Sequence, residues 1–138
     1  MADLSITPAQ VLPSTGAKYL HGIAGEALTA GEVVYKKSSD GRYWKADADV
    51  EASADADGLV VAEAEAAGAG VLVQYAGDIT LGAGAAPTQG QTYVVSATAG
   101  GIGLEGELAS DDYLTYLGYG IGTNAVRLMI KATGIAHA

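Results

Sequence analysis

Apolar residues alternate with polar ones in short runs along this chain, and turn residues separate the runs. Residues 25–49 show the pattern most clearly, with a turn at 30–31, an apolar run at 33–35, an Asp-Gly turn at 40–41 and a second run at 42–45. Valine, tyrosine and tryptophan in runs this short suit a pleated, half-buried surface, and Asp-Gly between two runs is a hairpin signal. The stretch therefore predicts a strand, a tight turn and a returning strand.

Similar runs predict further strands over residues 19–24, 59–62, 71–75 and 78–81. One region differs, because alanine occupies nearly every second position between residues 47 and 57. Alanine has the highest intrinsic helix propensity. We therefore expect at most one short helix, near residues 50–57.

The second half of the chain repeats the order of the first. Residues 89–96 match 30–37 at an offset of about 55–60 residues, and later segments keep a similar offset. The later matches are 99–101 with 40–41, 113–117 with 59–62, and 125–130 with 71–75. We expect an all-β fold, a small β-barrel or jelly-roll-like sandwich built from two similar four-strand units within a single domain over residues 19–138.

Residues 1–18 differ in composition and predict an extended N-terminal arm. Their two prolines each remove a backbone donor, which excludes a central strand but permits pairing along a sheet edge. Four apolar side chains, those of Leu4, Ile6, Val11 and Leu12, then need a surface outside their own sheet. We expect an arm that is mobile in the free protein and ordered on a partner, with a frayed terminus as the alternative.

Charge and composition exclude several classes of function. The chain of 138 residues has a formal charge of −9, which opposes binding to a phosphate backbone, so nucleic acid is not an expected partner. It has no cysteine, which removes disulfides and thiol chemistry. Its longest uncharged stretch, 79–104, is interrupted by glycine and proline, and its start does not resemble a signal peptide, so no membrane association is expected.

The sequence motifs that could indicate a catalytic, nucleotide or metal site are all incomplete. Residues 101–106 spell G-x-G-x-x-G, but an acidic segment follows where a dinucleotide site needs a helix. The acidic run 47–57 lacks the glycine of a calcium loop, having Ala52 at the sixth position, and leaves only a weak divalent site open. His21 and His137 stand at opposite ends of the chain. We expect a protein that is not an enzyme, with no catalytic residues, cofactor or metal.

Tyrosine is the remaining signal, because it is enriched where a surface is apolar yet wet. Alternation along one strand places Tyr113 and Tyr119 on one face with Thr115 and Leu117 between them, and Tyr116 on the other face. These tyrosines are candidate partner contacts, and ordinary sheet positions are the alternative.

Taken in order, the motifs cover almost the whole chain. They are Met-Ala-Asp-Leu-x-Ile-Thr at 1–7, Gly-Glu-Ala-Leu-x-Ala-Gly at 25–31, Asp-Gly-x-x-Trp-x-Ala-Asp-Ala at 40–48, and Ala-Thr-Gly-Ile-Ala-His-Ala at 132–138. In these motifs the chain resembles the small capsid decoration, or cement, proteins of tailed bacteriophages. The motifs do not fix whether two-fold or three-fold positions of a capsid are occupied.

The resemblance implies a barrel-like or jelly-roll-like subunit that binds the outside of an assembled phage head and stabilises the lattice of the major capsid protein. It implies two partners, the major capsid protein and further copies of the chain, as a homotrimer or alternatively a homodimer. It also implies synthesis in the cytoplasm of the bacterial host and a final location on the outer capsid surface. The expected contacts are the four apolar arm residues and the three tyrosines. The competing hypothesis is a carbohydrate-binding or adhesin-type β domain displayed on a particle surface, with Trp44 and Tyr43 as its aromatic platform.

Overall fold

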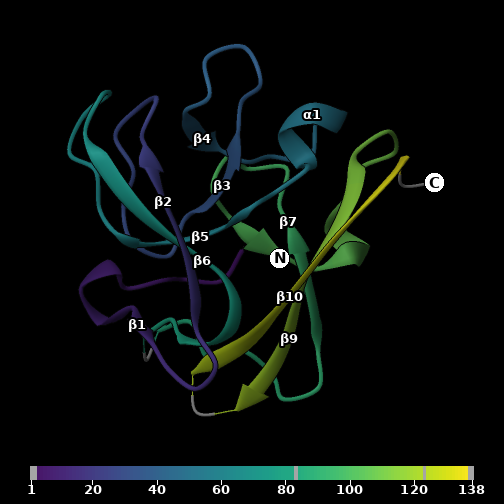
Figure 1. Cartoon of the computed structure of the whole chain (residues 1–138). Helices are drawn as coiled ribbons and strands as arrows, with labels where there is room; N and C mark the ends of the chain where they lie inside the picture. Colours follow the sequence, from purple (N-terminus) through teal and green to yellow (C-terminus); the bar gives the residue numbers. More distant parts are fainter. Residues whose placement is uncertain (1–2, 83, 123, 137–138) are drawn as a thin grey trace.

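The computed structural model describes residues 3–82, 84–122 and 124–136, and nearly all regular structure in them is β-strand. Helical structure is limited to α1 (Glu51–Ala54) and the 3₁₀ turns η1 (Pro8–Gln10) and η2 (Glu105–Glu107). The strands are β1 (Leu12–Pro13), β2 (Lys18–Ile23), β3 (Val33–Lys36), β4 (Tyr43–Lys45), β5 (Gly58–Ala62), β6 (Gly70–Thr80), β7 (Thr92–Val95), β8 (Ile102–Gly103), β9 (Tyr113–Gly122) and β10 (Ala125–Ala136). Figure 1 shows them as one curled antiparallel sheet, so the predicted all-β, barrel-like fold is confirmed.

The sheet is built from two units with the same connectivity. Its strand order is β4-β3-β5-β6-β10-β9-β7-β8. The first unit is β3 to β6 and the second is β7 to β10, and from either edge of the sheet the strands of a unit come in the order second, first, third, fourth. In each unit the first strand pairs with the second and third, and the third pairs with the fourth. The two fourth strands, β6 and β10, pair with each other and join the units. The predicted repeat of four strands is therefore present in the fold.

The repeat extends to the strand that precedes each unit. β2 lies antiparallel along the first part of β6, from Lys18 opposite Ala76 to Ile23 opposite Gly70. The second part of β6 lies in the same way along β10, with Ala76 opposite Met129 and Thr80 opposite Ala125. The last strand of each unit therefore begins beside an antiparallel neighbour: β6 begins beside β2, and β10 begins beside the second part of β6.

Two main clusters of buried side chains hold the sheet in its curled form. The larger joins both units, because it contains side chains from β3 and β5 as well as from β7, β9 and β10. The smaller lies within the first unit, where Ala24, Val34, Tyr43, Val60 and Val71 meet. A bridge between Ala24 and Tyr43 closes this smaller cluster by bringing the end of β2 against β4. Burial of aliphatic side chains on this scale is the main stabilising contribution in a domain of this size.

Candidate partner-binding surface

The N-terminal arm packs on its own domain, which corrects one expectation. Leu4, Ile6 and Val11 are partly buried against the larger core cluster, so their own domain covers these three side chains and no partner protein is needed to do so. Leu12 differs, because it lies in the short strand β1 beside Thr80 of β6 and is 65% exposed. The prolines exclude the arm from the sheet centre, but they do not prevent it from lying across the open end of the core.

Backbone and side-chain bonds fix the arm to both units. The Leu4 N–H donates to the Ile102 carbonyl at 2.9 Å, and the Thr7 N–H donates to the Leu81 carbonyl at 3.2 Å. The Ser96 hydroxyl donates to the Asp3 carboxylate at 2.8 Å. Because Leu81 directly follows β6 in the first unit and Ile102 lies in β8 of the second, the arm braces one unit against the other.

Two glycines make room for the arm. Gly31 has φ of +91°, and a Cβ there would overlap the Ile6 side chain. A Cβ on Gly101 would overlap the Asp3 carboxylate. Sequence reasoning assigned both glycines to turns and missed Asp3 altogether. The available signal was the acid at position 3 together with the glycine-rich turn at 100–103, but nothing in the sequence pairs them.

The three tyrosines do not form one surface, and the predicted shared face of Tyr113 and Tyr119 is wrong. Leu117 is buried in the larger core, whereas Tyr119 lies opposite the exposed residue Arg127. The pairing of β9 with β10 shifts between Gly118 and Tyr116, and this irregularity breaks the alternation on which the prediction depended. Tyr116 packs on a small cluster containing Val94, so it serves the fold of its own domain.

Tyr119 instead takes part in an ion-pair cluster at the junction of the two units. The Arg127 guanidinium donates from Nε to Asp78 Oδ1 at 2.8 Å and from Nη2 to Oδ2 at 3.3 Å. Its Nη1 donates to the Tyr119 hydroxyl at 3.3 Å, and its carbon lies 5.9 Å from the centroid of that ring. Hydrogen bonding to the Asp78 carboxylate raises the pKa of Arg127 above its usual range. The cluster links β6 to β10 and β9 and leaves Tyr119 half-buried.

Most of the large apolar side chains that remain exposed belong to β1, β2, β6 and β10. Tyr19 and Ile23 of β2 are 46% and 42% exposed, and Met129 and Ile135 of β10 are 62% and 64% exposed. The complete set is Leu12, Tyr19, Leu20, Ile23, Val50, Tyr75, Met129 and Ile135. Of the seven expected contacts only Leu12 belongs to it. The sequence did not single out the others because strand patterns do not reveal which faces and edges of the folded sheet remain uncovered.

The two residues of the expected aromatic platform, Tyr43 and Trp44, make contacts within their own domain. Tyr43 is buried in the smaller core cluster, and the Trp44 ring lies against Gly25, where a Cβ would overlap it. The Lys37 ammonium nitrogen lies 4.9 Å from the centroid of the Trp44 ring, and the indole N–H donates to the Asp40 carboxylate. The geometry thus favours a structural role for Trp44.

Clefts and polar clusters offer little for chemistry. A cleft of about 460 Å³ lies between α1 and the β9–β10 hairpin and is lined in part by Glu51, Asp55, Tyr113 and Thr133. In the part of the chain that the structure describes, no three histidine, aspartate or glutamate side chains gather as a metal site would require, and no helix is long and apolar enough to cross a membrane. His137 lies outside the described residues.

Comparisons with known proteins gave no match. The chain matches no family model, no curated protein and no solved structure. What the chain does must therefore be inferred from its own residues and geometry.

Proposed function

We propose that this chain is a decoration protein that binds the outside of an assembled phage head and stabilises the lattice of its major capsid protein. The observation that carries the proposal is that seven of the eight exposed large apolar side chains of the described residues lie on β1, β2, β6 and β10, while most other large apolar groups are buried. Exposed aromatic, methionine and aliphatic side chains of this kind supply contact area in protein–protein interfaces. The ordered set of motifs in the sequence, which resembles that of decoration proteins, supplies the class of partner.

The charge of the chain suits this role. At −9 the free molecules repel one another at long range, which keeps a protein made in many copies soluble. Apolar contact acts only at short range, so it favours attachment where a lattice presents a complementary surface. Attachment at many sites then amplifies a small gain per contact.

The N-terminal arm, which is bonded to both units of the sheet, also suits the role of a decoration protein. A protein that stabilises a lattice must resist deformation when neighbouring subunits move apart, and the arm connects the two halves of the sheet through Asp3, Leu4 and Thr7. The exposed residue at the arm's end, Leu12, is then available to the lattice. We propose that the subunits act there as homotrimers, with homodimers as the alternative.

Co-sedimentation with expanded heads of the parent phage tests the proposal. We expect saturable binding of the purified chain to heads that lack it, and greater resistance of the decorated heads to heat. Leu12→Ser should weaken binding at least severalfold, whereas the matched variant Leu12→Met, which keeps an apolar side chain, should bind like the parent protein. A chain that stays in the supernatant at saturating concentration, particularly one that binds glycans on an array, would contradict it.

A further inference from the structure

One side of β2 and one side of the end of β10 have no described strand partner over most of their length, and the charges near them are complementary. We infer that the chain binds a second copy of itself head to tail, with the edge of β2 in one copy lying against the C-terminal part of β10 in the next. The inference goes beyond head binding and does not depend on it, because it concerns contacts between copies of this chain alone.

The first edge belongs to β2. Among the described residues β2 pairs with β6 along Lys18–Ile23, and its other side meets a strand only where the adjoining Ala24 bridges to Tyr43. Over Lys18–Gly22 that side is therefore open. All but one of its residues are exposed, and its one charged side chain at neutral pH is that of Lys18. An open edge of this kind is able to accept another strand.

The second edge belongs to the end of β10. β6 covers one side of β10 only as far as Met129, and from there to Ala136 the described pairing is with β9 alone. The equivalent segment of the first unit is the second part of β6. By contrast with the end of β10, it has a strand on each side, β10 and β1. The end of β10 has one neighbouring strand and exposes Ile135.

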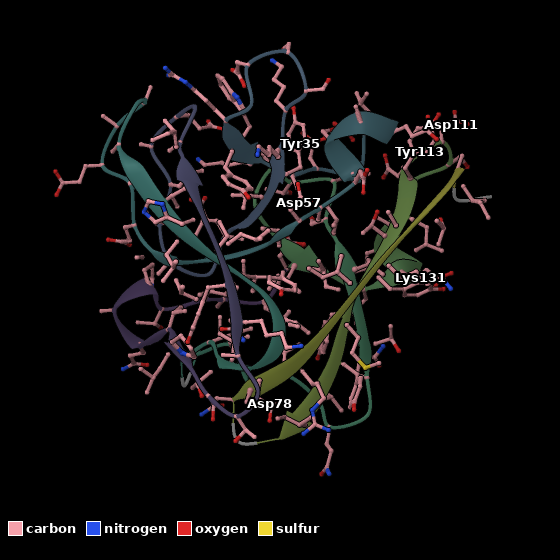
Figure 2. All side chains as sticks on the ribbon, in the orientation of Figure 1. Tyr35, Asp57, Asp78, Asp111, Tyr113 and Lys131 are labelled. Carbon is pink, nitrogen blue, oxygen red and sulfur yellow. The ribbon has the colours of Figure 1, made fainter. Side chains whose placement is uncertain are left out.

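The surroundings of this second edge are acidic at its far end. The Glu51 carboxylate lies beside Gly134, where a Cβ would be 3.2 Å from Glu51 Oε2. Figure 2 shows Asp111 at the same end of the β9–β10 hairpin, with Lys131 further back along the strand. The edge therefore has a base at Lys131 and, further toward its C-terminal end, the Glu51 carboxylate beside Gly134.

This distribution of charge selects one arrangement. An antiparallel contact brings Lys18 of one copy to the acidic end of β10 in the next and places Lys131 near Ile23. A parallel contact would set Lys18 against Lys131, and like charges opposite each other are destabilising. Pairing β2 with a second β2 would give the Lys18 ammonium of neither copy an acidic partner, because β2 contains no Asp or Glu. Head-to-tail contacts between unlike surfaces generate closed rings when the rotation closes, so the arrangement is compatible with a trimer.

Cysteine cross-linking tests the arrangement directly, because the chain has no cysteine of its own. Tyr19→Cys and Ile135→Cys replace exposed side chains on the two edges. Under mild oxidation at high concentration, a mixture of the two variants should form a disulfide-linked dimer within minutes, and either variant alone should form far less. Leu12→Cys, exposed but on neither edge, is the control partner for each. Equal cross-linking of Tyr19→Cys with itself, or none in the mixture, would overturn the inference.

A charge exchange provides a second and independent readout. Lys18→Glu and Glu51→Lys each place like charges across the contact and should weaken self-association severalfold in sedimentation equilibrium at low salt. The double variant restores opposite charges and should associate like the parent protein. Unchanged association of both single variants would contradict the contact. Because neither experiment contains phage heads, its failure is distinct from a failure of head binding.

Discussion

Asp78 is nearly buried, and one half-exposed guanidinium, that of Arg127, pairs with its carboxylate. Arg127→Ala leaves that carboxylate with little solvent and no countercharge. We expect the free energy of unfolding, measured by urea denaturation, to fall, and to fall less at high salt. Adding Asp78→Asn should recover part of the loss, because it removes the unpaired charge. If Arg127→Ala unfolds like the parent protein, the ion pair makes no net contribution at the junction.

Asp57 makes the stability of the fold depend on pH. Burial raises the pKa of its carboxyl, although the Lys36 N–H donates to it at 2.6 Å and acts in the other direction. A carboxyl whose pKa is higher in the folded state favours folding fully below its unfolded value of about 3.8–3.9, and that contribution is lost as the pH rises through the folded value.

Asp57→Asn should therefore raise the free energy of unfolding at pH 7, and the difference from the parent protein should shrink as the pH falls through the raised folded pKa toward about 3.8. Thermal melts across the pH range from about 3 to 7 check this. A variant that is less stable at pH 7 would mean that the bond to Lys36 outweighs the cost of burial.

Among the elements, the arm shows where sequence reasoning stopped. The two prolines correctly predicted an extended segment that pairs along a sheet edge, as β1 does with β6. The same reasoning gave the arm residues no surface in their own domain, because contacts such as Ile6 with Gly31 join positions far apart in the chain. Similarly, alternation along β9 was predictable, but the shift in pairing near Gly118 was not, since it depends on β10.

The docked arm gives a prediction about stability. Ile6→Ala should lower the free energy of unfolding by about 1–2 kcal/mol, less than for a fully buried isoleucine because Ile6 is only partly buried. Leu12→Ala removes a side chain that is 65% exposed and should change stability by less than about 0.5 kcal/mol. Chemical denaturation of the two variants side by side provides the comparison. Equal and small effects would show that the arm does not contribute to the stability of the domain.

For the whole molecule, the repeat was the most informative feature of the sequence. Matching turns at 30–31 and 89–90 correctly predicted two units of four strands, because each unit follows the same local hairpin rules. The pairing of β6 with β10 that joins the units is a long-range contact that no local signal specifies. For the same reason the open edges of β2 and β10 became visible only in the folded chain, and with them most of the exposed apolar surface.

A density map of heads incubated with saturating chain tests the proposed function most directly. We expect ordered subunits on the outer surface of the capsid, with Leu12 and neighbouring apolar side chains against the major capsid protein, and with adjacent copies in mutual contact. A map with no additional density on the outer surface would contradict the account.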